Sequence, residues 1–225
     1  MAAKKLRQHN QEQEFYVTKL ISTTFRDLIP STVKSIIFTD KVVMPSSATL
    51  INVNEDDGII TWLDGTTMYV STEKNGVKVK ANRNSNNMFY LCSNLATLDL
   101  SNFDTSNVID MSSMFYGCNN LTKLDVSNFD TSNVEDMNSM FCFCNISALT
   151  VLDLSKWDTS NVKDMSGMFY ECHCLTTIKV GDKFKWVNRL SVLGLTGTWQ
   201  DETGTQYTSS DRFPSNVAHT YIKVS

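Results

Sequence analysis

Hydrophobic residues recur along the middle of the chain in one repeated pattern. Copies of the pattern begin at Leu95, Leu121 and Leu149, and a fourth begins at Leu175, so the period is 26 residues with one interval of 28. A fixed period of this length is typical of solenoids, in which each repeat buries its apolar face only by stacking on its neighbours. The repetition therefore predicts a stack of coils.

Each copy begins with an alternation of apolar and polar residues. In the first copy, Leu98 and Leu100 alternate with Thr97, Asp99 and Ser101. Neighbouring side chains of a strand point to opposite faces. The alternation therefore predicts a short strand with one buried face and one exposed face.

The second half of each copy has a different spacing. Its apolar residues in the first copy lie three or four positions apart, at Val108, Met111, Phe115 and Cys118. This spacing predicts a short helix with one buried face, and the pair Asn107 and Asp110 resembles a capped helix start. The alternative is a second short strand over residues 107–111 followed by a single helical turn. Either version closes one coil, and stacked coils place equivalent residues about 4.8 Å apart.

The segments on both sides of the repeats are predicted to be β-rich caps, because the open ends of a stack expose apolar core and unpaired strand edges. An amphipathic helix is expected over residues 15–28, ending before Pro30. Strand-like runs follow at residues 33–39, 49–53, 59–63, 67–71 and 77–80. Tight turns are expected at Asp57-Gly58, Asp64-Gly65 and Asn75-Gly76, and a hairpin around residues 202–204.

Composition and charge narrow the possible partners. The 225 residues are 41% hydrophobic with only three prolines, which suits one folded body with a sizeable core. The net charge is −4 and no basic stripe occurs, so no nucleic-acid partner is expected. Residues 1–15 lack the apolar run of a signal peptide, and no stretch approaches the roughly eighteen apolar residues of a membrane span. We therefore expect no membrane insertion, and a chain that stays in the cell, leaves it by a route such as phage lysis, or has lost a leader.

Six cysteines raise the question of metal or disulfide chemistry. Four of them share one repeat position on the predicted buried face, where packing is the expected role: Cys92, Cys118, Cys144 and Cys172. Cys142 and Cys174 lie outside that position and, with Cys144, Cys172 and His173, form C-x-C and C-H-C clusters on adjacent coils. A zinc site or a disulfide there stays open as an alternative, although the usual C-x-x-C spacing is missing.

Three rows of aspartates repeat with the coils. Asp104, Asp130 and Asp158 follow the strand, where aspartate commonly accepts hydrogen bonds from the backbone two residues on. Asp110, Asp136 and Asp164 fit helix starts. The third row, Asp99, Asp125 and Asp153, points outward from the strands without an evident structural need for charge, and Lys179 ends it in the fourth copy.

The sequence contains no recognised catalytic motif. The histidines, His9, His173 and His219, fall in three different parts of it, so no pair has the spacing of metal ligands or a proton relay. No G-x-S-x-G, glycine-rich phosphate loop or H-E-x-x-H occurs. We expect no enzyme activity, no cofactor and no metal.

The repeat resembles a known family. The run L-x-x-L-D-L-S-x-F/W-D-T-S-N-V-x-D-M-S-x-M-F-x-x-C is similar to the signature of BspA-family leucine-rich repeat surface proteins of bacteria and mycoplasmas, over residues 88–180. Flanking segments such as FRDLIPSTVKSIIFTD and GTWQDETGTQY resemble that family's lead-in and terminal cap. The resemblance implies binding or adhesion at a cell surface without catalysis, and it carries over no binding residue. Surface members normally have an export signal, and residues 1–15 are not expected to be one.

Pattern and resemblance together predict an α+β fold. We expect a leucine-rich-repeat-like solenoid of about three to four 26-residue coils with β-rich caps. The expected parts are an N-terminal arm and helix (1–30), a β-rich N-terminal cap (31–87), the solenoid (88–180) and a C-terminal β cap (181–225).

The favoured function is a binding module that engages a protein or glycan partner through the exposed strand face. That face is predicted to comprise Thr97, Asp99, Ser101, Lys123, Asp125, Ser127, Val151, Asp153, Ser155, Thr177 and Lys179. A second hypothesis is a structural or accessory subunit of a phage particle or another assembly, tethered by the polar arm from Met1 to Gln13. A remote third is an enzyme or zinc protein that uses Cys142, Cys172, His173 and Cys174.

Overall fold

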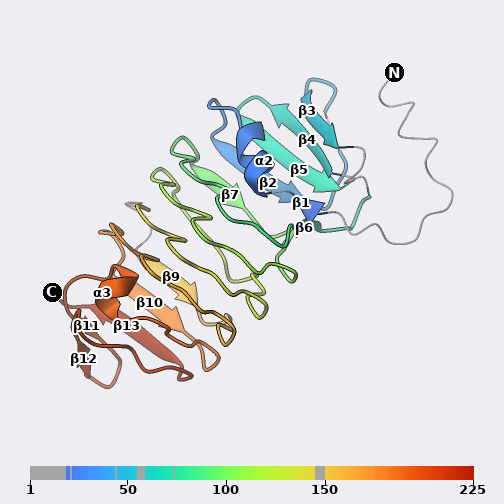
Figure 1. Cartoon of the computed structure of the whole chain (residues 1–225). Helices are drawn as coiled ribbons and strands as arrows, with labels where there is room; N and C mark the ends of the chain where they lie inside the picture. The colour runs from blue at the N-terminus through green and yellow to red at the C-terminus, as the bar shows by residue number, and fades with distance from the viewer. Residues whose placement is uncertain (1–18, 21, 44, 55–58, 73, 145–149) are drawn as a thin grey trace.

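The computed structural model describes residues 19–20, 22–43, 45–54, 59–72, 74–144 and 150–225. Within them the fold is mostly β with few helices, which agrees with the coarse prediction of an α+β or β-rich fold. Figure 1 shows the order of the chain along one axis: the N-terminal strands lie at one end, the repeats follow side by side, and the C-terminal strands lie at the other end.

The N-terminal part consists of one short helix and strands in two sheets. Its elements are β1 (Lys19–Leu20), α2 (Ser22–Leu28), β2 (Ser35–Thr39), β3 (Thr49–Asn54), β4 (Ile59–Asp64), β5 (Thr67–Thr72) and β6 (Val79–Ala81). The larger sheet has the order β3-β4-β5-β2-β7, where β7 (Thr97–Asp99) is the strand of the first repeat. The strands predicted from residue 33 to residue 80 are thus confirmed, with small shifts of their ends.

Other N-terminal predictions are only partly right. The helix ends at Leu28, before Pro30, but it begins at Ser22, and Lys19–Leu20 form a strand. Asp64-Gly65 joins β4 and β5 in the expected hairpin, with Gly65 at φ +60°. Asn75-Gly76 also turns the chain, yet it leads from β5 to β6, which belong to different sheets. The predicted turn at Asp57-Gly58 and the arm from Met1 to Gln13 lie outside the described residues.

The C-terminal part closes the other end with a five-stranded sheet of order β12-β11-β13-β10-β9. Its elements are β9 (Val151–Leu154), β10 (Thr177–Val180), α3 (Leu190–Leu193), β11 (Trp199–Gln200), β12 (Gln206–Tyr207) and β13 (His219–Lys223). The expected hairpin around residues 202–204 joins β11 to β12, with Gly204 at φ +87°. The ladders β2–β7 and β10–β13 cross the boundaries expected after residues 87 and 180, and the division into four parts stays a prediction.

The strands of the repeats have the alternating burial that their sequences predict. β7, β9 and β10 each bury every second residue and turn the others outward. No strand is assigned to the equivalent segment of the second repeat, residues 123–126, although Leu124 and Val126 are buried there. Leucine and valine thus point into the core whether or not the segment joins a ladder.

The predicted helix in the second half of each coil is wrong. Residues 112–117 form a series of turns in which a backbone N–H bonds three residues back, as in Tyr116 to Ser113 at 3.1 Å. The chain cannot continue as a helix because Ser113 and Gly117 have left-handed backbones, at φ +53° and +69°. The alternative of a short strand and a turn is closer, since Asp110 makes an isolated parallel bridge to Asp136. Residues 111–118 and their equivalents are named the turn strip below.

Peptide groups of the turn strip are hydrogen-bonded from coil to coil. The Leu91 N–H donates to the Tyr116 carbonyl at 2.7 Å, the Gly117 N–H to the Cys142 carbonyl at 2.9 Å, and the Phe143 N–H to the Tyr170 carbonyl at 2.8 Å. One peptide group, between residues 116 and 117, therefore accepts from the coil before it and donates to the coil after it. Such chains align their dipoles and strengthen one another.

Groups outside the repeats cap the chain that starts at Tyr90 at one end and two parallel chains, which end at Met165 and Phe169, at the other. At the N-terminal end, Arg26 of α2 donates from Nε to the Tyr90 carbonyl at 2.5 Å, which places a cation at the negative end of the aligned dipoles. At the other end, the Asn188 side chain accepts from the Met165 N–H at 3.0 Å. The carbonyl of Leu193, in α3, accepts from the Phe169 N–H at 2.8 Å.

Buried side chains also form ladders from one repeat to the next. The rings of Phe89, Phe115, Phe141 and Phe169 follow one another at centroid distances of 5.5, 5.7 and 6.0 Å and are nearly parallel. Three buried threonines, Thr105, Thr131 and Thr159, use their hydroxyls to bridge to the next coil. A single hydrophobic core runs from Phe25 to Tyr221.

Candidate functional site

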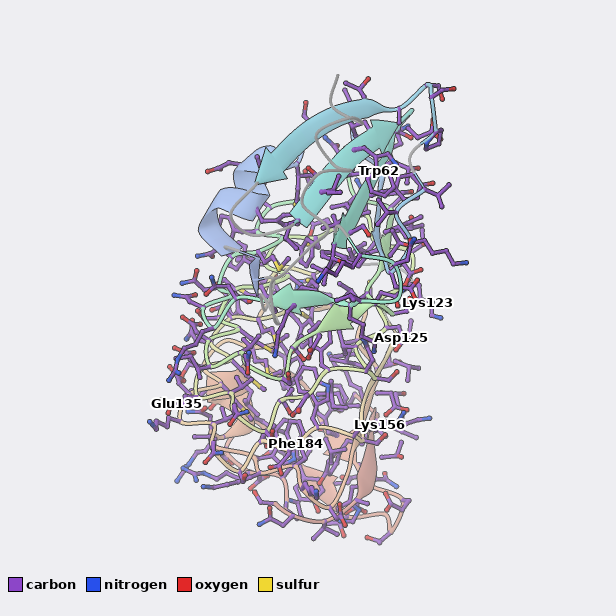
Figure 2. The ribbon with its side chains drawn as sticks, turned by 90° about the vertical axis from the view of Figure 1, so that its right-hand side faces the viewer. Trp62, Lys123, Asp125, Glu135, Lys156 and Phe184 are labelled. Carbon is purple, nitrogen blue, oxygen red and sulfur yellow. The ribbon has the colours of Figure 1, made fainter. Side chains whose placement is uncertain are left out.

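The predicted strand face is exposed. Its residues lie in three rows along the stack: Thr97, Lys123, Val151 and Thr177; Asp99, Asp125, Asp153 and Lys179; Ser101, Ser127 and Ser155. All are exposed except Ser127 and Thr177, which are half-buried. Pairing of β9 with β10 sets Val151 beside Thr177 and Asp153 beside Lys179. Figure 2 shows Lys123 and Asp125 close together at one edge of the molecule and Glu135 at the opposite edge.

The outward aspartates have a structural role that the sequence analysis did not assign to them. The carboxylate oxygens of Asp99, Asp125 and Asp153 accept the backbone N–H two residues on, from Ser101, Ser127 and Ser155, at 2.9, 3.1 and 3.0 Å. Each carboxylate therefore holds the turn at the end of its strand. The expectation that nothing in the fold uses these groups is wrong.

Hydrogen bonds from the serines also lower the pKa of two of these aspartates. Hydrogen bonds from Ser127 lower the pKa of Asp125, with a smaller effect from Lys123 and Lys156. For Asp153 the hydrogen bond from the Ser155 side chain is again the largest cause of the lowered pKa, and Lys179 adds to it. Both groups thus carry a negative charge at neutral pH. The charge of Asp125 stays accessible to a partner. Its ion pair with Lys123 is long, at 3.9 Å between Nζ and Oδ2, and both side chains are exposed.

Residues of the C-terminal part extend the face. β13 pairs antiparallel with β10 and sets Thr220 beside Lys179 and Ile222 beside Thr177. Ile222 and Val151 are each about half exposed, at 50% and 48%, and lie on either side of Thr177. Repeat analysis missed Thr220 and Ile222 because their strand lies outside the repeats and runs in the opposite direction.

The other two aspartate rows are structural. Asp104, Asp130 and Asp158 accept the backbone N–H two residues on, as predicted. Asp110, Asp136 and Asp164 do the same at the start of the turn strip and do not cap helices. Burial, with the neighbouring charges of Asp110 and Asp164, raises the pKa of Asp136.

The cysteine ladder packs inside the stack. Cys92, Cys118 and Cys144 are buried and Cys172 is half-buried. The Sγ atoms of Cys118, Cys144 and Cys172 donate to the carbonyls of Phe89, Phe115 and Phe141 in the preceding coil, at 3.1, 2.8 and 2.9 Å. Burial raises the pKa of each of these thiols, and that of Cys142 to about 11. Thiols in this state are poor nucleophiles.

The Cys and His residues that the structure describes do not gather into one cluster. Within the described ranges, no three His, Cys, Asp or Glu side chains converge as metal ligands would. His173 faces Glu171 at 2.5 Å and His219 faces Glu202 at 2.9 Å, in separate parts of the chain. His9 lies outside the described residues. The zinc and enzyme alternatives therefore gain no geometric support here.

Comparison with known proteins finds one family model that is similar to the repeats. Residues 83–191 match the family described as "Mycoplasma protein of unknown function, DUF285". The match fits a mycoplasma-type repeat protein and does not point to BspA in particular. No curated protein and no solved structure matches the chain. Of the helices in the described part, none is long and apolar enough to cross a membrane.

Proposed function

We propose that this chain is a leucine-rich-repeat-like solenoid of the BspA type. Its role is that of a non-enzymatic binding module, which engages a partner through the strand face. The observation that carries the proposal is the repetition of exposed residues in four repeats, while the alternate residues of the same segments are buried. Repeat stacks commonly bind through such extended surfaces.

Equivalent residues that pair from coil to coil support the solenoid. Asn84, Asp110, Asp136 and Asp164 form successive parallel bridges, and they are 26, 26 and 28 residues apart, as the repeats are. Phenylalanines, threonines and cysteines follow the same register. Each coil thus contacts mainly the one before and the one after it.

The chemistry of the face favours a folded protein over a glycan as the partner. It combines a row of three carboxylates with exposed Lys123, Lys156 and Lys179 and with the apolar side chains of Val151 and Ile222. A folded partner can bury the two aliphatic side chains, and complementary charges steer the partner and set its register. We propose a partner that places cationic side chains along the aspartate row.

A charge-neutral variant tests this proposal. Asp99→Asn, Asp125→Asn and Asp153→Asn together keep a side-chain oxygen for each serine N–H, so the melting temperature should change little. Loss of three charges should weaken binding about tenfold, at about 0.5 kcal/mol per charge. The partner is first captured from host and cell-envelope extracts, and its affinity for both proteins is then measured by calorimetry.

Glu135→Gln is the matched control, because Glu135 is an exposed carboxylate at the opposite edge of the molecule. It should bind the captured partner as the wild type does. Equal binding by the triple variant and the wild type would place the partner on another surface. If Glu135→Gln weakened binding of the partner as much as the triple variant does, the effect would come from the net charge of the protein and not from the aspartate row.

A further inference from the structure

A row of aromatic side chains runs along the outside of the turn strip. Tyr90, Tyr116, Phe143 and Tyr170 contact one another in order, at centroid distances of 4.8, 5.4 and 5.6 Å. Phe143 and Tyr170 are 40% and 49% exposed, and Leu91, which follows Tyr90 at the other end of the row, is 49% exposed. This aromatic row is separate from the strand face and takes no part in its proposed function.

The second repeat, which begins at Leu121, supplies its ring to the aromatic row from a different position. The repeat position of Tyr90, Tyr116 and Tyr170 is occupied there by buried Cys142, and the ring comes instead from Phe143. Phe143 has a left-handed backbone, at φ +56°, which is unfavourable for a bulky residue. Leu91, Gly117 and Glu171 hold the equivalent position in the neighbouring repeats and also have left-handed backbones, at φ +52°, +69° and +60°. The left-handed turn is therefore a feature of the fold, and Phe143 uses it to place an exposed ring where Cys142 replaces the tyrosine.

A hollow lies at the N-terminal end of the aromatic row. It has a volume of about 580 Å³ and is lined by Arg26, Asn87, Tyr90, Ser113 and Tyr116. Arg26 belongs to α2, Asn87 and Tyr90 precede the first repeat, and Ser113 and Tyr116 belong to it. The lining thus combines two aromatic rings, an amide, a hydroxyl and a guanidinium, with no aliphatic side chain.

The guanidinium of Arg26 is only partly engaged. Its Nε donates to the Tyr90 carbonyl, which holds the side chain at the edge of the hollow. No ion pair of the described ranges involves Arg26. The two terminal amino groups can therefore take a carboxylate in a bidentate pair.

We propose that this hollow binds a carboxylate-bearing sugar unit of a glycan. The guanidinium of Arg26 pairs with the carboxylate, the polar atoms of Asn87 and Ser113 bond the hydroxyls, and the rings of Tyr90 and Tyr116 cover the apolar part of the sugar. The lining favours such a ligand, since small-ligand sites combine aromatic surface with a few polar groups that fix the orientation of the ligand. A protein interface would need about 800 Å² on each side, which is far more than five residues supply. Further sugar units follow the aromatic row over Phe143 and Tyr170.

The experiment uses the full chain and three acidic probes: tetramers of galacturonic acid, tetramers of glucuronic acid, and sialyllactose. Binding is measured by calorimetry and by NMR, and the fully methyl-esterified galacturonate tetramer and a tetra-aspartate peptide serve as controls. We expect at least one acidic glycan to bind, with its neutral or esterified counterpart at least tenfold weaker. Failure of all three to bind, equal affinity for the ester, or tighter binding of the peptide would overturn the proposal.

Variants locate the site. Arg26→Gln removes the positive charge and keeps a donor for the Tyr90 carbonyl, and Tyr116→Ala removes one ring. Each variant should bind the acidic glycan at least tenfold more weakly than the wild type. The melting temperature of each should be nearly unchanged. If Tyr116→Ala unfolds the protein, Arg26→Gln and the chemical shifts of Asn87 and Ser113 show whether the glycan binds in the hollow.

Phe143→Gly should weaken the binding of a tetramer more than the binding of a monosaccharide. The triple aspartate variant of the strand face should bind the glycan normally, and loss of binding there would contradict a separate site.

Discussion

Replacement of Thr131 by valine is expected to destabilise the protein by about 2–4 kcal/mol, although the two side chains have nearly the same shape. The Thr131 side chain is buried, and its hydroxyl both donates to the Asp158 carbonyl at 2.9 Å and accepts from the Asp158 N–H at 3.0 Å. Valine leaves both backbone groups without this partner, and each unsatisfied group costs about 1–3 kcal/mol where it is buried. The free energy of unfolding in urea measures the effect.

Thr131→Ser is the matched control for this prediction. Serine keeps the hydroxyl and loses one methyl group, which should cost about 1 kcal/mol. The difference between the two variants therefore isolates the bridge from Thr131 to the next coil. If valine were no worse than serine, the threonine ladder would not hold the coils together.

Phe141→Ala is expected to cost about 3–5 kcal/mol, as large-to-small changes of buried aromatic residues do. Phe141 is fully buried, and its ring contacts Phe115 at 5.7 Å, Phe169 at 6.0 Å and Trp157 at 6.3 Å. Because these rings belong to three neighbouring coils, the cavity would weaken the stack on both sides. A loss of this size is a large fraction of the roughly 5–15 kcal/mol of a typical domain.

Phe143→Gly provides the comparison, two residues away in the same coil. Its ring is 40% exposed, and glycine relieves the left-handed backbone, so stability should change by less than about 1 kcal/mol. Thermal and urea unfolding of the two variants should thus differ clearly. Similar losses for both would show that the phenylalanine ladder is not the centre of the core.

The strand half of each coil could be predicted from sequence, and the other half could not. Alternation of Leu98 and Leu100 with polar residues is local information, and it holds even where no strand is assigned. Spacings of three and four residues are ambiguous, because consecutive three-residue turns bury the same positions as a helix. The signal that separates them is glycine at repeat positions: Gly117 and Gly167 mark the two left-handed sites that Ser113, Ser139 and Phe143 also occupy.

The exposure of the strand face could likewise be predicted, but not all of its chemistry. Asp99 precedes Ser101 by two residues, as Asp104 precedes Ser106, so the same turn could have been inferred for both rows. The aromatic row was not foreseen because Phe143 departs from the register that its neighbours keep. Arg26 joins that surface from a helix far away in sequence, which only the fold reveals.

Hydrogen exchange of single amides tests the central claim, that the coils are joined peptide to peptide along the turn strip. The N–H groups of Ser113, Phe115 and Gly117 donate to the next coil at 2.8, 2.9 and 2.9 Å. They should exchange about a thousandfold or more slowly than free amides, as groups released only by global unfolding do. The amides of Asn107 and Asn133, for which the described residues show no acceptor, should exchange fast. Fast exchange at residues 113, 115 and 117 would contradict the stack of coils on which both proposed surfaces depend.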